Sequence, residues 1–160
     1  MTTATQSILE SLSTDQPTFD WAALLKQILG AFDCSTGTIH TLDRSTNLLR
    51  LKAFEGIPEF LLPKMTVIPV GKGMAGVAAK RRQPVQICNL QTDESGVARP
   101  SARDTKVEGS MAAPMMLDGA LYGTLGIAKS IPYDFTDEET AALMAIGKAL
   151  AQKLKDQAEQ

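Results

Sequence analysis

A glycine-rich turn is the stretch whose residue types most resemble a chemical motif. It reads Gly71-Lys72-Gly73-Met74-Ala75-Gly76 and lies between a short apolar run and an alanine-rich segment. Phosphate-binding turns need GxxxxGK followed by Ser or Thr, or a GxGxxG that opens a βαβ crossover, and this turn supplies only the glycine spacing. We predict a structural turn in which Gly71 and Gly73 adopt backbone angles that other residues avoid. Gly76 would allow close packing and Lys72 would be solvated, with anion binding as the alternative.

Nucleophilic and metal-binding side chains are few. The chain has two cysteines, Cys34 and Cys88, and one histidine, His40, with no CxxC pair. A structural zinc site needs about four ligands, so we predict no metal site. Cys88 lies in an apolar run and is predicted to be a buried free thiol, with a redox or ligand-contacting thiol as the alternative. No catalytic constellation is present, and we expect a protein that is not an enzyme.

Composition narrows the class of protein further. The 160 residues are 44% hydrophobic with a formal net charge of −2, which fits one globular domain and gives no electrostatic footprint for nucleic acid. No apolar run approaches the roughly 18 residues of a membrane span. The first ten residues, MTTATQSILE, lack the basic-then-apolar order of a signal peptide. We therefore expect a cytoplasmic protein that binds neither nucleic acid nor membrane.

Hydrophobic periodicity predicts helices at both ends of the chain and hairpins between them. Apolar residues at helical spacing predict a helix over residues 18–33, preceded by a short helical extension within residues 1–17. Alternation predicts one hairpin over residues 37–54 and a second over 110–128, with Asp118-Gly119 as its turn. A further strand is expected over 84–90, and a capping box predicts a last helix from 136 to about 157. This order indicates an α+β fold.

Residues 91–109 form an unusually long segment without strand or helix periodicity. Loops of this length inside a compact domain are commonly functional or mobile. We expect this segment to be a mobile lid over a ligand site.

Five segments, in this order and spacing, resemble a known family: residues 68–76 (IPVGKGMAG), 83–85 (QPV), 111–115 (MAAPM), 119–125 (GALYGTL) and 135–139 (FTDEE). Together they are similar to a GAF domain, here over residues 18–157. The resemblance implies a central antiparallel sheet of five or six strands. It also implies N- and C-terminal helices packed on one face of the sheet and a ligand pocket on the other.

GAF-like folds host sensors, chromophore binders and the enzyme free methionine-R-sulfoxide reductase, so the family does not fix the function. The reductases carry one cysteine in the glycine turn, where this chain has Ala75, and another in the long loop, where this chain has none. Bilin binders need chromophore-holding residues that this loop lacks. Cyclic-nucleotide binders show an NKFDE signature, whereas this chain has Ala128-Lys129 and then Phe135 with shortened spacing. The resemblance therefore favours a sensory or regulatory domain that binds an unidentified small molecule.

Site residues are expected on the strands and the lid. The apolar wall is predicted from Cys88, Met111 and Ala113, and the polar contacts from Arg99, Arg103 and Asp104, with a solvated loop and ordinary core as the alternatives. No cofactor is identified.

A homodimer through the terminal helices is also expected. It would cover apolar residues that the sheet cannot bury, namely Ile8, Leu9, Leu12 and the alanines of the last helix. Because no effector domain is recognised, the domain is expected to act in trans in signalling. The remaining alternative is a dimerisation or interaction module with a vestigial pocket.

Overall fold

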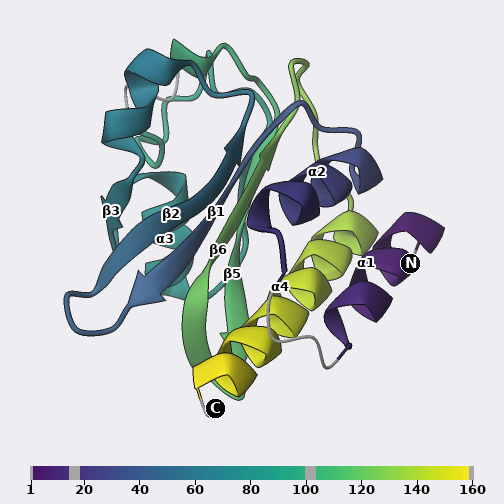
Figure 1. Ribbon diagram of the computed structural model, residues 1–160. Coiled ribbons are helices and arrows are strands. Elements are labelled where there is room, and N and C mark those ends of the chain that lie inside the picture. The colour runs from purple at the N-terminus through teal and green to yellow at the C-terminus, as the bar shows by residue number, and fades with distance from the viewer. Residues whose placement is uncertain (1, 15–18, 100–103, 159–160) are drawn as a thin grey trace.

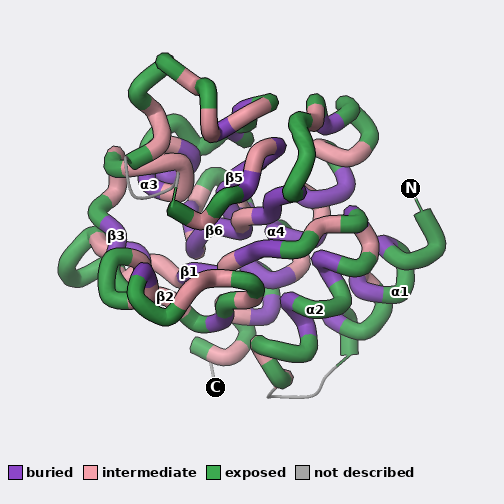
Figure 2. Tube along the Cα trace, turned by 90° about the horizontal axis from the view of Figure 1, so that it is seen from above, coloured by how far each residue is buried: buried purple, intermediate pink, exposed green. Residues whose placement is uncertain are grey.

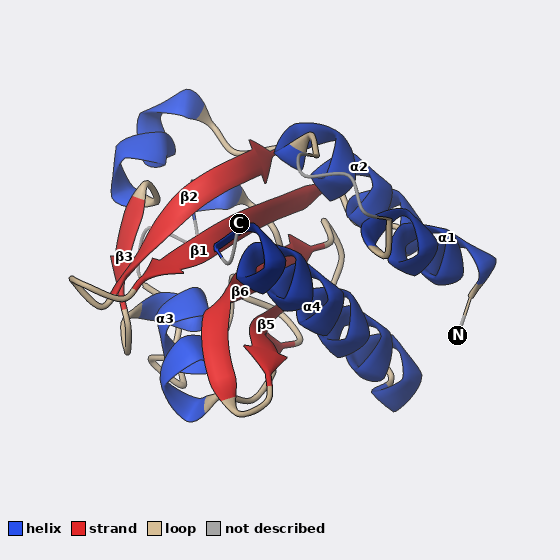
Figure 3. Ribbon diagram, turned by 60° about the horizontal axis from the view of Figure 1, so that its bottom comes forward, coloured by secondary structure: helices blue, strands red, loops and turns tan. Residues whose placement is uncertain are grey.

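The computed structural model describes residues 2–14, 19–99 and 104–158. Its elements follow one another as α1 (Thr3–Leu12), α2 (Trp21–Ala31), β1 (Thr36–Asp43), β2 (Leu48–Glu55), η1 (Glu59–Lys64), β3 (Val67–Pro69), α3 (Gly73–Arg81), β4 (Val85–Ile87), β5 (Ser110–Leu117), β6 (Ala120–Ala128) and α4 (Asp137–Ala158). The strands form one antiparallel sheet of six, in the order β3-β2-β1-β6-β5-β4. Helices α2 and α4 cover one face with α1 packed against them from outside, and α3 lies on the other face (Figures 1 and 3). The predicted α+β architecture is confirmed.

Both predicted hairpins are present, because their signals are local. Strand β1 pairs with β2 and β5 with β6, in both cases antiparallel. Asp118 and Gly119 have φ angles of 50° and 79°, the pair of positive values that a two-residue hairpin turn of this kind requires.

Strand β4 is shorter than the predicted strand over residues 84–90. Beyond Ile87 the backbone leaves β5 and finds other partners. The Cys88 carbonyl accepts from the Tyr133 N–H at 3.0 Å, and the Leu90 N–H donates to the Glu108 carbonyl at 2.8 Å. Cys88 therefore lies past the end of the strand, where the chain turns outward.

The helix ends depend on side-chain caps. Asp20 accepts from the N–H groups of Ala22 and Ala23 at 3.0 and 3.2 Å, so α2 begins at Trp21 and ends at Ala31, inside the predicted range of 18–33. The predicted capping box opens α4, since Glu139 N–H donates to Thr136 Oγ1 and Thr136 N–H to Glu139 Oε1. No helix in the described part of the chain combines the length and apolarity needed to cross a membrane.

The main core lies between the sheet and the terminal helices. Alternate residues of the central strands point to this face, among them Ile39 of β1 and Leu125 of β6. They meet the apolar stripes of α2 and α4, including Ile28 and Ile146, both fully buried. The buried segments gather where these elements meet (Figure 2).

Helix α1 belongs to the same core. Ile8 and Leu12 are only 3% and 6% exposed, and α1 packs against α2 and α4. The Lys153 ammonium on α4 donates to the Thr14 carbonyl at 2.6 Å and ties the end of α1 down. These two side chains were part of the reason for expecting a homodimer, and the chain covers them itself. Of the other residues on which that expectation rested, Ala142 is buried, Leu9, Ala145 and Ala149 are half-buried, and Ala141 is exposed. The homodimer stays a prediction.

Candidate ligand-binding site

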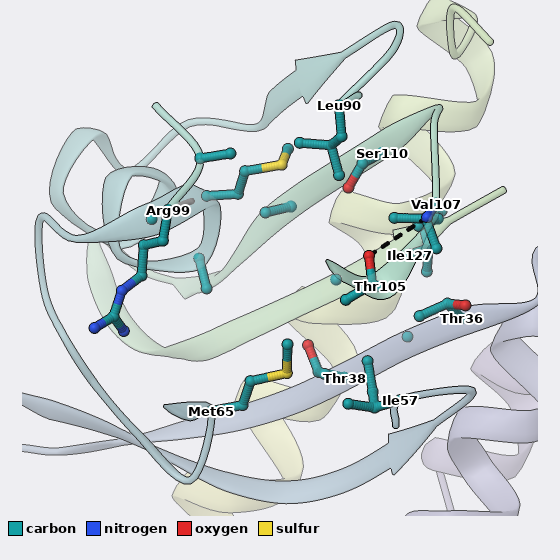
Figure 4. A pocket seen from close by; sticks show the side chains of 18 of the residues that line it. Thr36, Thr38, Ile57, Met65, Leu90, Arg99, Thr105, Val107, Ser110 and Ile127 are labelled. Carbon is teal, nitrogen blue, oxygen red and sulfur yellow. Dashed lines mark hydrogen bonds between the residues drawn. The ribbon is translucent and has the colours of Figure 1, made fainter. Parts of the chain in front are cut away.

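A cavity of about 150 Å³ lies on the sheet face opposite the terminal helices. Its floor comes from β1, β5 and β6, and its walls come from η1, the start of α3 and the segment between β4 and β5 (Figure 4). Apolar side chains such as Met65 and Leu90 line most of it. A cavity of this size holds a ligand comparable to benzene.

The floor is polar because of strand alternation. On β1, Ile39 packs into the helix-side core, so Thr36, Thr38 and His40 face the cavity. On β5, Ser110 reaches the same space. Hydroxyl and imidazole groups therefore lie beneath an otherwise apolar chamber, which is typical of sites that orient small ligands.

The glycine turn has the structural roles predicted for it. Gly71 and Gly73 have φ angles of 98° and 68°, in the left-handed region that favours glycine. A Cβ on Gly76 would lie 2.6 Å from the Pro69 carbonyl oxygen, so only glycine permits the approach of α3 to the end of β3. Lys72 is exposed at the cavity mouth, as predicted.

Arg99 spans this mouth. A Cβ on Gly73 would lie 3.1 Å from both Cγ and Cδ of Arg99, so the arginine stem lies directly over the first residue of α3. Its Nη1 donates to the Lys64 carbonyl at the end of η1, at 3.4 Å. The long segment is thereby joined to both neighbouring walls.

The segment predicted to be a lid does border the cavity, through residues that include Ala98, Arg99 and Val107. It is better anchored than its composition indicates, because Val107 and Leu90 are buried with Ile87 and Ala128 in a small apolar cluster. Its mobility stays a prediction, and residues 100–103 lie outside the described residues.

Comparison of the sequence with protein-family models identifies the family to which this fold belongs. The sequence model described as "GAF domain" matches residues 22–155. The chain belongs to the GAF domain family. Comparison with curated proteins found no match.

Solved GAF domains share the fold at low sequence identity. The GAF domain of a phosphoenolpyruvate-protein phosphotransferase from Coxiella burnetii has a TM-score of 0.80 and 18% identity, covering 99% of this chain and 98% of that one. Free methionine-R-sulfoxide reductase from Neisseria meningitidis, in complex with its substrate, has a TM-score of 0.78 and 19% identity, covering 98% and 89%. A GAF domain from A. Aeolicus has a TM-score of 0.70 and 24% identity, covering 95% of this chain and 93% of that one. These likenesses establish the fold alone.

Four site residues were predicted on or near the lid, and of the three that the structure describes, one borders the cavity. Arg99 lines the mouth, whereas Asp104 is exposed and does not line the cavity. Arg103 lies outside the described residues. Cys88 was predicted to be buried, but it is exposed and does not line the cavity, because β4 ends one residue before it.

The two residues predicted on β5 both belong to the helix-side core, and one of them also lines the cavity. Met111 lines the cavity, and its Sδ accepts a 3.5 Å hydrogen bond from Thr140 of α4 on the helix side. Ala113 is fully buried in the helix-side core and does not line the cavity. Their neighbours Ser110 and Ala112 line the cavity as well. Of the two predicted residues, Met111 therefore lines the cavity and Ala113 does not.

The thiols of this GAF domain lie away from the site. Burial raises the pKa of Cys34 to about 11, with Lys129 opposing the rise. Desolvation and the nearby Asp134 carboxylate raise the pKa of Cys88. Both are protonated at neutral pH and are therefore weak nucleophiles. No group of three or more His, Cys, Asp or Glu residues that could hold a metal occurs within the described ranges.

His40 is the functional candidate that the sequence analysis missed. It is 1% exposed and lines the cavity, and its Nε2 lies 2.8 Å from the Met65 carbonyl. Burial lowers its pKa, which the hydrogen bond to Met65 opposes. The alternation of Thr36, Thr38 and His40 with apolar Ile39 was the signal that could have placed it on the cavity side.

Proposed function

We propose that this GAF domain is a sensory or regulatory module that binds a small molecule in the cavity above β1, β5 and β6. The observation that carries the proposal is the cavity itself, a mostly apolar chamber with polar side chains on its floor. Among the similar structures is a putative GAF sensor protein from Burkholderia vietnamiensis, with a TM-score of 0.75 and 19% identity. A role in signalling and a cytoplasmic location are parts of the same proposal.

Native mass spectrometry of the purified protein tests for a ligand. We expect an added mass on the wild-type chain and none on Thr38→Phe, because the larger side chain fills the cavity floor. Thr38→Val is the matched control, since it keeps the side-chain volume and should retain the added mass. A bare mass for the wild-type chain, together with no thermal shift from any small molecule tested, would contradict the proposal.

The proposal assigns no catalytic turnover to this GAF domain. The Neisseria meningitidis relative is a free methionine-R-sulfoxide reductase, and reduction of a sulfoxide by this route needs thiolates at the substrate. Here Ala75 stands in the glycine turn, and no cysteine is among the described residues that line the cavity. Cys34 and Cys88 are both outside it.

Turnover of free methionine-R-sulfoxide with a dithiol reductant should therefore equal the rate without protein. Coupled reductant consumption measures it, with the double variant Cys34→Ser, Cys88→Ser as the control. Turnover well above background that the double variant abolishes would show that the thiols act catalytically and would overturn this prediction.

An interaction module with a vestigial pocket is the other alternative. It draws less support from the structure, because Ile8 and Leu12 of α1 are buried within the chain and do not offer an apolar docking surface.

A further inference from the structure

Three cations from three different elements converge at the mouth of the cavity. Lys64 ends η1, Lys72 precedes α3, and Arg99 comes from the segment between β4 and β5. None of them makes an ion pair within the described part of the chain, and no Asp or Glu is among the described lining residues. Like charges held together without a carboxylate repel one another and attract an anion.

The first turn of α3 adds to this positive field. Gly73, Met74 and Ala75 line the cavity, and they are the residues whose backbone N–H groups have no intrahelical acceptor. Lys72 occupies the N-cap position without a side-chain cap, and the first turn carries no acidic residue. The end of the helix that favours negative charge is therefore left open to the cavity.

The imidazole of His40 indicates, independently of the cations, that the ligand carries a hydrogen-bond donor. The Met65 carbonyl can only accept, so His40 Nε2, 2.8 Å away, must carry the hydrogen. In the neutral ring Nδ1 is then an acceptor. It is buried and has no hydrogen-bond partner in the described residues, and the same is true of Oγ1 of Thr124, the residue opposite His40 on β6. Because buried polar atoms in proteins are nearly always satisfied, Nδ1 calls for a donor, which a ligand in the cavity lined by His40 can supply.

We propose that the ligand is a small organic anion that also carries an N–H or O–H donor. Its negative group lies at the rim, on Lys72, Arg99 and the first turn of α3, and its donor reaches Nδ1 of His40. The apolar walls, including Met65 and Leu90, hold the body between the two polar ends. This inference rests on the proposed function, since it names the chemical class of ligand for the same cavity.

Matched probe molecules test separately the need for a negative charge and the need for a hydrogen-bond donor on the ligand. The probes are two hydroxy acids whose apolar bodies fit a cavity of this size, mandelate and leucic acid. Calorimetry compares the affinity of each for the protein with that of its primary amide and with that of the acid that lacks the hydroxyl. We expect the hydroxy acids to bind about tenfold or more tightly than either partner, the difference that one lost charge-assisted or buried hydrogen bond produces.

Variants assign each preference to its residues. Lys72→Gln and Arg99→Gln should each weaken acid binding and leave amide binding unchanged, whereas Arg81→Gln, an equal charge change at an exposed position in the last turn of α3, should alter neither. His40→Phe should remove the preference for the hydroxyl, and His40→Gln, which keeps an acceptor, should retain it. His40→Met replaces the phenylalanine variant if that protein does not fold.

The outcomes distinguish a failure of the anion-and-donor inference from a failure of the proposed small-molecule binding. Equal binding of acids and amides overturns the anion and leaves small-molecule binding standing. A hydroxyl preference that persists in His40→Phe overturns the role of Nδ1. If no probe binds, a molecule retained in native mass spectrometry is identified: an acid with a donor supports the inference, and a neutral molecule overturns it. No probe binding and no retained mass overturn both the inference and the proposed function.

Discussion

Replacing Lys129 by methionine is expected to lower the free energy of unfolding by about 2–4 kcal/mol, the cost of losing two hydrogen bonds from a buried charged group. The Lys129 side chain is 7% exposed, and its ammonium donates to the carbonyls of Phe32 and Asp33 at 2.7 and 3.0 Å. These carbonyls follow the last turn of α2, where the helix dipole favours a cation. The ammonium also lies 4.5 Å from the centre of the Tyr133 ring.

Urea denaturation at neutral pH measures this loss. Methionine keeps most of the length and apolar stem of lysine, so the change isolates the ammonium. Lys148→Met, at an exposed position of α4, is the matched control and should change the unfolding free energy by no more than about 0.5 kcal/mol. Equal stabilities of the two variants would show that Lys129 does not hold the end of α2.

Lys129 also shows how a family signature can mislead about a site. In the sequence it falls where cyclic-nucleotide binders have the second residue of NKFDE. In the fold it points to the end of α2 and is not among the described residues that line the cavity. Its conformation depends on carbonyls nearly a hundred residues earlier in the chain, which no local pattern reveals.

The parts of the fold that sequence predicted well have local causes. The capping box at Thr136, the two-residue turn at Asp118-Gly119 and the alternation along β1 each involve residues a few positions apart. The glycine turn belongs to this class too, because left-handed φ angles constrain single residues.

The phase of β5 could not be obtained in this way. Ser110–Leu117 is buried along nearly its whole length, since α4 packs on one side and α3 on the other. A strand buried on both faces has no polar alternation to tell one face from the other. Met111 and Ala113 were therefore both assigned to the cavity wall. In the structure Met111 lines the cavity and also contacts Thr140 of α4 through its sulfur, whereas Ala113 lies in the helix-side core.

The mouth of the cavity depends on long-range contacts. Arg99 meets Gly73 and the Lys64 carbonyl, which come from segments that sequence analysis treats separately. Arg99 was selected because it lies on the long loop. Its partners at the rim, Lys64 and Lys72, were not, because a lone lysine in sequence is most often solvated.

Stability should fall as the pH is lowered from about 7.5 to 5.5, because His40 is held neutral in the folded protein. Burial lowers its pKa below the ordinary value of 6.5. Below about pH 6.5 the unfolded chain therefore takes up a proton that the folded chain does not. Stability is full above that pH and is lost as the pH falls toward the folded pKa. The slope approaches at most about 1.4 kcal/mol per pH unit for one proton.

The chain makes this measurement clean, because His40 is its one histidine. Ordinary carboxyl groups titrate below about pH 5, and hydrogen bonds from Ser45 and Arg50 lower the pKa of Asp43 further. Urea denaturation across the window should give a falling unfolding free energy for the wild-type chain. His40→Gln keeps a donor for the Met65 carbonyl but cannot titrate, so its unfolding free energy should be flat. An equal fall in both proteins would assign the pH dependence to other groups and would remove the evidence for a neutral, hydrogen-bond-accepting His40 at the cavity floor.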